Sequence, residues 1–192
     1  NKIKYFASVF SIDDANLHLK VSNDIVKIPS MESRNKKLII YCVKKFKKII
    51  LSTGTSNLKE IKEIIKFIPK KKLTLMHCVS SYPCELKNIN LLKIQKLRKL
   101  SNKVGFSDHT IGTLASKISL EFDPELIEKH FTISRKLPGK DNKFAILPYE
   151  LYEIKKYIEN RKKSLIWRGD NFQKCENEVR KKYSGRWSLN SE

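Results

Sequence analysis

The chain has 192 residues, 40% of them hydrophobic, which is enough to bury one core and predicts a single main domain. Its 40 Lys and Arg against 20 Asp and Glu give a formal net charge of +20, a balance that attracts anionic substrates and is also common in nucleic-acid-binding proteins. No apolar run approaches the ~20 residues of a membrane span, so we expect no membrane partner and a cytoplasmic protein.

Six short apolar runs predict buried strands. In chain order they are Phe6–Phe10, Ile25–Ile28, Lys48–Ser52, Leu73–Cys78, Val104–Phe106 and Leu126–Glu128. Between them, apolar residues recur at helical spacing from Leu58 to Ile68 after a Ser56 cap, from Leu91 to Leu100, from Ile111 to Ile118, and from Pro148 to Ile158. Because strands and helices alternate, we expect an α/β fold with a parallel sheet. Six strands are too few to close an eight-stranded barrel.

The end of the chain has another character. It holds Trp167-Arg-Gly-Asp170, a short polar helical stretch from Cys175 to Lys182, and Tyr183-Ser-Gly-Arg-Trp187. We assign no chemistry to this tail, which could dock on the main domain or contact another subunit.

Four cysteines give no metal signal. Cys42, Cys78, Cys84 and Cys175 have no Cys-x-x-Cys spacing. We expect reduced thiols, with Cys42 and Cys78 in the core.

Two histidines stand in matching contexts, Gly105-Phe-Ser-Asp-His109-Thr110 and Leu126-Ile-Glu-Lys-His130-Phe131. Each comes where a predicted strand gives way to a loop, the edge at which barrels of alternating strands and helices carry out chemistry. Two imidazoles meeting there could hold one divalent metal ion and leave positions open for a substrate. Taken singly, either histidine also fits a structural role beside its strand.

Five segments form an ordered series of motifs. They are Ile49-Ile-Leu-Ser-Thr-Gly54, Leu75-Met-His-Cys-Val-Ser-Ser-Tyr-Pro83, Gly105-Phe-Ser-Asp-His-Thr110, Ile127-Glu-Lys-His-Phe131 and Leu137-Pro-Gly-Lys-Asp141. In order and spacing they resemble the sialic acid synthase family, from about Tyr5 to about Tyr152. Members condense phosphoenolpyruvate with an N-acetylated hexose such as N-acetylmannosamine, giving a sialic acid and free phosphate. The resemblance therefore implies a transferase of carbohydrate biosynthesis.

The resemblance also implies a TIM-type (β/α) barrel, incomplete here, with strands three to eight of eight. We expect this partial barrel over residues 1–163 and a C-terminal extension over residues 164–192. Family members begin with two further strands, whose Ala-Glu-Ile-Gly type segment holds a candidate catalytic glutamate. Nothing in this sequence matches that segment or the family's C-terminal antifreeze-like domain. We expect truncation to impair catalysis.

Hydroxyl groups gather at the predicted strand ends. Lys27, Ser30, Ser52 and Ser107 lie at or just after strands, and Ser8 lies with the first. A trianionic phosphoenol ester needs a cation and several neutral donors, which one Lys ringed by hydroxyls supplies. Any single serine could instead cap a helix in a tight turn. Carried over from the family, the phosphoenolpyruvate contacts fall on Ser8, Lys27, Ser30, Ser52, Ser80 and Ser107.

By the same resemblance, Glu32, Tyr82 and Asp141 match positions that hydrogen-bond the open-chain N-acetylhexosamine. Glu32 has an alternative as a solvated loop acid. The family often has His after Pro-Gly-x-Asp, where this chain has Asn142. This departure leaves open which acceptor sugar is used.

The family's metal ligands fall on His109 and His130, and Mn²⁺ or Mg²⁺ is the ion that the resemblance implies. Two neutral imidazoles alone would not exclude zinc. The metal would bind the aldehyde oxygen of the sugar as a Lewis acid. The oligomeric state stays open, with a homodimer as one option.

Two other classes of function stay open. One is a non-catalytic remnant of such a synthase, which the two missing strands would suggest. The other is a basic nucleic-acid-binding module. Only seven of the 40 basic residues are Arg and the lysines are scattered over helix faces, whereas nucleic-acid sites favour Arg forks and exposed aromatic rings. The sequence therefore favours the enzyme, without a nucleic-acid partner.

Overall fold

The computed structural model describes residues 3–187. The chain divides into two units, one ending at Ile158 and the other beginning at Glu159. The first two residues of the predicted domain 1–163 and residues 188–192 of the predicted extension lie outside the described residues. Within residues 3–187, no helix combines the length and the apolar character needed to cross a membrane.

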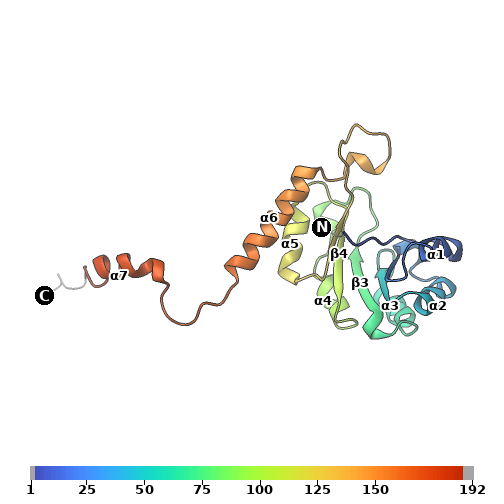
Figure 1. The fold of residues 1–192 in the computed structure, drawn as a ribbon, viewed down its shortest axis with the longest axis horizontal. Helices are drawn as coiled ribbons and strands as arrows, with labels where there is room; N and C mark the ends of the chain where they lie inside the picture. Colours follow the sequence, from blue (N-terminus) through green and yellow to red (C-terminus); the bar gives the residue numbers. More distant parts are fainter. Residues whose placement is uncertain (1–2, 188–192) are drawn as a thin grey trace. The chain divides into compact units, whose positions relative to one another are not determined.

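The first unit is built on a curved sheet of five parallel strands, in the order β1-β2-β3-β4-β5 (Figure 1). The strands are β1 Ile25–Ile28, β2 Lys48–Ser52, β3 Leu73–Cys78, β4 Val104–Asp108 and β5 Ile127–Lys129. The α/β class and the parallel sheet are thus confirmed, in the form of a half-barrel.

The predicted first strand, Phe6–Phe10, is wrong as a full strand. This segment makes only an isolated parallel bridge, between Ser8 and Lys27. Val9 is buried in the core, but Phe10 is 56% exposed. Helix α1, Ile12–Leu19, follows at once, since the Ser11 side chain accepts the N–H of Asp14 and caps it. The chain therefore leaves the sheet after Val9.

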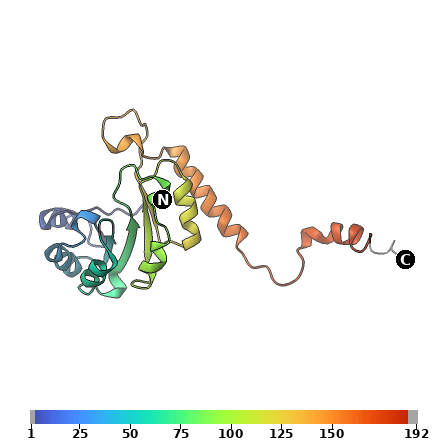
Figure 2. The ribbon, with the colours of Figure 1, turned by 180° about the vertical axis from the view of Figure 1, so that it is seen from behind.

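Helices connect the strands and cover one side of the sheet (Figure 2). After α1 they are α2 Lys36–Lys45, α3 Leu58–Ile65, α4 Lys93–Arg98, α5 Leu114–Ser119 and α6 Pro148–Ser164. The predicted Ser56 cap is wrong: Asn57 caps α3, in a capping box with Glu60. The Ser56 hydroxyl is instead bonded to that of Ser33, at 2.9 Å. Pro148 opens α6 as predicted.

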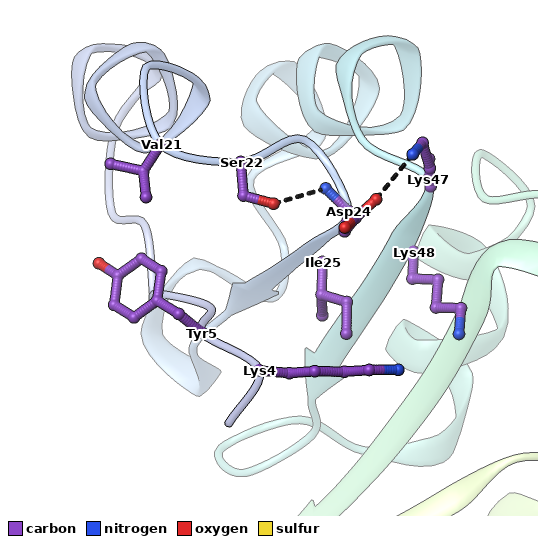
Figure 3. A pocket seen from close by; sticks show the side chains of 8 residues that line it. All are labelled: Lys4, Tyr5, Val21, Ser22, Asp24, Ile25, Lys47 and Lys48. Atoms are coloured by element: carbon purple, nitrogen blue, oxygen red, sulfur yellow. Dashed lines mark hydrogen bonds and ion pairs between the residues drawn. The ribbon is translucent and has the colours of Figure 1, made fainter. Parts of the chain in front are cut away.

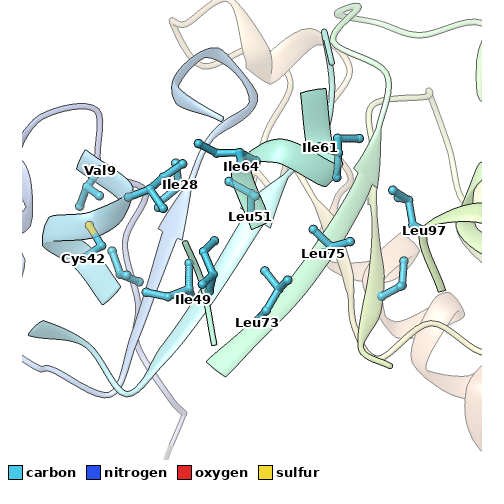
Figure 4. Close-up of a cluster of buried hydrophobic side chains, with 14 of the residues drawn as sticks. Val9, Ile28, Cys42, Ile49, Leu51, Ile61, Ile64, Leu73, Leu75 and Leu97 are labelled. Atoms are coloured by element: carbon cyan, nitrogen blue, oxygen red, sulfur yellow. The ribbon is translucent and has the colours of Figure 1, made fainter. Parts of the chain in front are cut away.

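The two faces of the sheet differ in chemistry, because successive side chains of a strand point to opposite sides. On one face, aliphatic side chains such as Ile49, Leu51, Leu73 and Leu75 pack with the helices into a single core (Figure 4). Burying each of them contributes roughly 1.5–3 kcal/mol. The alternate residues of the same strands face the other way, and they are largely polar towards the carboxyl ends: Lys27, Ser52, Cys78, Ser107 and Glu128.

The cysteines are free thiols. Cys42 and Cys78 are buried, as predicted, and so is Cys84, whereas Cys175 is exposed.

The second unit holds the last turns of α6, a short 3-10 helix at Lys174–Glu176 and helix α7, Asn177–Tyr183. Contacts of aromatic rings lie within it. The Arg180 guanidinium lies 4.4 Å from the centre of the Phe172 ring, and the rings of Tyr183 and Trp187 are stacked. The helical stretch predicted from Cys175 to Lys182 is therefore present, with its start shifted by two residues and its end by one.

Candidate active site

The two histidines lie side by side at the carboxyl edge of the sheet. β4 ends at Asp108 and β5 at Lys129, and these two residues are paired in register. His109 and His130 are the next residues, and the centres of their rings are 5.6 Å apart. Both histidines therefore lie directly after a strand, as predicted.

His109 is held in one orientation. Its Nδ1 donates to the carbonyl of Val79 at 2.8 Å, which leaves Nε2 unprotonated in the neutral ring, with the Ser107 hydroxyl 3.3 Å away. Burial lowers the pKa of His109 and the neighbouring His130 acts in the same direction, which favours the neutral ring. An imidazole in this state can bind a metal through Nε2.

Lys27 and Ser107 converge on a residue that the sequence analysis did not single out, Glu128 of β5. The Glu128 carboxylate accepts from the Lys27 ammonium at 2.5 Å and from the Ser107 hydroxyl at 2.8 Å. Burial alone would raise the pKa of Glu128, but Lys27 and Ser107 outweigh it and hold the pKa below its usual value. Glu128 is therefore a partly buried carboxylate on the inner face, held ionised by its two partners.

This contact also shows how far the sheet is rolled. Lys27 lies on β1 and Glu128 on β5, the two edge strands. In a flat sheet, strands four places apart would be roughly 19 Å apart, far beyond a Lys–Glu contact. The ion pair thus spans the concave side of the half-barrel.

The serines of β1 to β3 meet around Gly54. The Ser30 hydroxyl accepts the Gly54 N–H at 3.1 Å and lies 3.1 Å from the Cys78 sulfur. A Cβ on Gly54 would come within 2.3 Å of the Ser80 hydroxyl and 2.7 Å of the Ser30 hydroxyl, so only glycine fits. The hydroxyls of Ser52 and Ser80 are buried, with no hydrogen-bond partner among residues 3–187. Buried hydroxyls are rarely left without a partner, so these two can bind water or a polar ligand.

Of the three residues predicted to bind the sugar, two lie beside the histidines and one does not. The Tyr82 ring is 4.3 Å from the His109 ring, and the Asp141 carboxylate is 3.5 Å from Nδ1 of His130. Glu32 accepts a hydrogen bond from Asn35 at 2.7 Å, at the start of α2. Tyr82 and Asp141 thus join the two histidines, whereas Glu32 is engaged with α2.

Ser8 is the predicted phosphoenolpyruvate ligand with the weakest structural support. It is exposed, and it lies on the bridged segment beside Lys27.

The sequence did carry a signal for Glu128. It precedes His130 by two residues, just as Ser107 precedes His109. Because side chains alternate along a strand, both must point to the same face as each other. The repeat of this spacing in two neighbouring strands predicts a Ser107–Glu128 contact, which the structure contains.

The amino ends of the strands form a different surface. A hollow of about 410 Å³ there is lined by Lys4, Tyr5, Val21, Ser22, Asp24, Ile25, Lys47 and Lys48 (Figure 3). Its one acid, Asp24, is paired with Lys47 at 2.7 Å. This hollow contains none of the predicted site residues.

Comparison with known proteins agrees with the half-barrel fold. The NeuB family profile matches residues 1–168. The chain belongs to the NeuB family.

Named relatives of this NeuB-family chain are synthases. It is 34% identical to the N,N'-diacetyllegionaminic acid synthase of Campylobacter jejuni, over 90% of this chain and 53% of that protein. It is 31% identical to the pseudaminic acid synthase of Helicobacter pylori, over 86% of this chain and 49% of that protein. The chain therefore spans about half the length of these curated relatives.

Solved structures agree with this. The N-acetylneuraminic acid (sialic acid) synthetase of Leptospira borgpetersenii, determined in complex with citrate, superposes with a TM-score of 0.80 at 31% identity. The match covers 93% of this chain and 65% of that one. The five-stranded half-barrel thus corresponds to part of a TIM-type barrel enzyme of this family.

Proposed function

We propose that this chain is the catalytic core of a synthase that condenses phosphoenolpyruvate with an N-acetylated hexose to give a sialic acid or a related nonulosonic acid. The observation that carries the proposal is the continuous row of polar contacts along the carboxyl rim, from Lys27 through Glu128 and Ser107 to His109. The synthase names of its relatives support the same reaction class.

Phosphoenolpyruvate would bind at the serine-lined part of this rim. Lys27 would supply the cation, and the hydroxyls of Ser52 and Ser80 would supply neutral donors. Ser30, Ser107 and Ser8 complete the proposed set. Glu128 holds the Lys27 ammonium in place, which fixes the cation before the anion arrives.

His109 and His130 would hold a divalent ion, Mn²⁺ or Mg²⁺. Among residues 3–187 there is no group of three or more His, Cys, Asp and Glu side chains placed to bind a metal. The unprotonated Nε2 of His109 and the nearby ring of His130 do fit an ion bound by two imidazoles, with its other positions left for substrate or water. When bound, such an ion supplies Lewis acidity to the sugar aldehyde.

The sugar would lie between Tyr82 and Asp141, with Glu32 as the third proposed contact. Asn142 does not point into this region, because its amide donates to the carbonyls of Leu137 and Pro138. It braces the loop that presents Asp141. The relatives act in legionaminic, pseudaminic and N-acetylneuraminic acid synthesis by name, which supports an N-acetylated hexose as the acceptor.

In the proposed reaction the rim residues mainly orient two substrates. The methylene carbon of phosphoenolpyruvate bonds to the aldehyde carbon of the sugar, water adds to the resulting cationic carbon, and the tetrahedral product expels phosphate. Serine hydroxyls and Lys27 keep the phosphate fixed while the bond forms. Correct orientation of two bound reactants can supply ~7–11 kcal/mol of such a barrier.

The remaining assignments follow from the same proposal. The half-barrel with its bridged Ser8 segment would be strands three to eight of an eight-stranded barrel, over residues 1–163, with residues 164–192 as an extension. We place the enzyme in the cytoplasm because phosphoenolpyruvate, a phosphorylated anion, does not cross membranes unaided. A homodimer is its proposed assembly.

The test compares the 192-residue chain with a form extended at its N-terminus by two family-type strands. Each is incubated with phosphoenolpyruvate, Mn²⁺ and either N-acetylmannosamine or a diacetamido hexose, and phosphate release is measured alongside the nine-carbon product. We expect the extended form to release phosphate only with sugar present, and the shorter form to be much slower. Phosphate release by neither form, with any sugar, would instead support the non-catalytic remnant.

A further inference from the structure

A buried ion pair lies directly behind the two histidines. Asp108 and Lys129 are the last residues of β4 and β5, and they are paired in register. The Lys129 ammonium lies 3.0 Å from the Asp108 carboxylate, and the side chains are 5% and 0% exposed. Each therefore immediately precedes one of the two histidines, on the face of the sheet opposite to Ser107 and Glu128.

The pair makes further hydrogen bonds to its surroundings. Asp108 Oδ1 accepts from the N–H and the hydroxyl of Thr110, both at 2.8 Å, and Oδ2 accepts from Ser116 of α5 at 2.6 Å. Lys129 also donates to the carbonyl of Thr110 at 2.6 Å. His109 thus lies between two residues, Asp108 and Thr110, that Lys129 of the neighbouring strand holds.

Stability alone does not account for these charges. Removing two charges from water is energetically costly, and well-packed apolar residues of similar size often stabilise a buried site as well or better. Two apolar side chains could also pack α5 against the sheet, but apolar contacts are not directional and would not fix the positions of the two strand ends. An ion pair with fixed donors and acceptors sets the spacing of the two strand ends.

We infer that Asp108 and Lys129 are a positioning pair, which fixes the ring of His109 relative to that of His130 and so sets the affinity of the site for a divalent ion. Neither residue needs to touch the ion or the substrate. The part of the inference that concerns metal affinity rests on the proposed function. The part that concerns the orientation of the two rings does not depend on it.

The test replaces the pair by neutral residues of similar shape, Asp108→Asn with Lys129→Met. An Asn at 108 can still accept from Thr110 and donate to Ser116, so the double variant is expected to fold. The matched control is Lys103→Met with Glu125→Gln, which removes an ion pair across the amino ends of the same two strands. Thermal unfolding reports on the fold of both variants.

The first readout is the ring ¹H–¹⁵N spectrum of ¹⁵N-histidine-labelled protein without metal, with signals assigned from His109→Gln and His130→Gln. The chain has four histidines, and the buried His18 and His77 serve as internal references. We expect the signals of His109 and His130 to move in the pair variant while those of His18 and His77 stay in place, and no change in the control.

The second readout is Mn²⁺ affinity by titration calorimetry. Loss of a group that orients a metal ligand typically costs about 10- to 100-fold, and we expect this loss for the pair variant and less than about twofold for the control. Unmoved ring signals and unchanged affinity in a folded pair variant would overturn the inference. If the wild-type chain bound no Mn²⁺ yet its ring signals moved in the pair variant, the proposed metal would fail and the positioning role would stand.

Discussion

The two ends of the sheet use lysine in opposite ways. At the carboxyl end, the Lys27 side chain is 13% exposed and that of Lys129 5%, and each has a carboxylate partner within 3.0 Å. At the amino end, a hollow of about 450 Å³ is lined by Lys44, Lys45, Phe46, Lys47, Lys48, Lys71 and Lys72. Four of these, Lys44, Lys45, Lys48 and Lys71, are exposed, with no ion pair among residues 3–187.

This difference shows why a net charge of +20 does not locate the function. Buried charges act on their neighbours through short contacts that salt hardly screens. Exposed lysines produce a field that falls off within about 8 Å at physiological ionic strength. Substitutions at the carboxyl end should therefore have large, specific effects, and those at the amino end small, salt-dependent ones.

The largest effect is expected at the histidines. His109→Ala or His130→Ala removes one of two proposed metal ligands, so Mn²⁺ binding should weaken by about 100-fold or more, measured by calorimetry. A variant at either position that binds Mn²⁺ as tightly as the wild type would contradict the metal site.

Lys27 should come next. Lys27→Ala removes a charge-assisted contact worth ~1.5–3 kcal/mol, so KM for phosphoenolpyruvate should rise by about 10- to 100-fold. The exposed Lys70 is the control, and Lys70→Ala should leave KM unchanged. Equal effects at the two positions would show that Lys27 is not the phosphate partner. Unfolding curves are needed as well, since the change leaves Glu128 without its cation.

Glu150 gives a smaller effect, on stability and with a pH dependence. Its carboxylate accepts from Arg135 at 2.5 Å and from the N–H of Leu147 at 2.8 Å, at the start of α6. Burial opposes ionisation, but Arg135 and the N–H outweigh it and hold the pKa of Glu150 below its usual value. The stabilisation is therefore present above the usual carboxyl pKa and is lost as pH falls through the lowered value.

Glu150→Gln should accordingly lower the free energy of unfolding by about 0.5–2 kcal/mol at pH 7, and the difference from wild type should shrink in acid. Glu153→Gln on the same helix is the control, because its partner Lys117 forms an exposed pair worth less than ~1 kcal/mol. A gap between wild type and Glu150→Gln that widened in acid would refute the assigned sign.

The smallest effect is expected at the amino end. Replacing Lys44, Lys45, Lys48 and Lys71 by Gln should change KM for phosphoenolpyruvate by less than about twofold at physiological salt. A somewhat larger change at low salt would fit a long-range field. A change as large as that for Lys27→Ala would remove the distinction between the two ends.

Much of the fold could be predicted from the sequence because buried strands of a parallel sheet are short, continuous apolar runs. Five of six predicted strands are present within about two residues. The sixth failed because an apolar run such as Phe6–Phe10 does not reveal that a helix cap follows it at Ser11. The pattern of apolar and polar residues also does not show that the Glu32 side chain accepts a hydrogen bond from Asn35, three residues further along the chain.

The site was predictable only as far as single strands allow. Strand-end positions gave His109, His130 and the serines, because they depend on local sequence. The contact of Lys27 with Glu128 depends on the roll of the whole sheet, and the pairing of Asp108 with Lys129 depends on register between strands. Neither the roll of the sheet nor the register between strands can be predicted from the sequence of a single segment.

The tie between Lys27 and Glu128 also bears on how the chain folds. The two residues are 101 positions apart, so their contact closes nearly the whole length of the half-barrel and forms only after the intervening strands have paired. Substitutions at either residue should therefore speed unfolding and leave the folding rate almost unchanged, with a φ-value near zero. In this chain the chemistry of the rim would be the last feature to appear and the first to be lost.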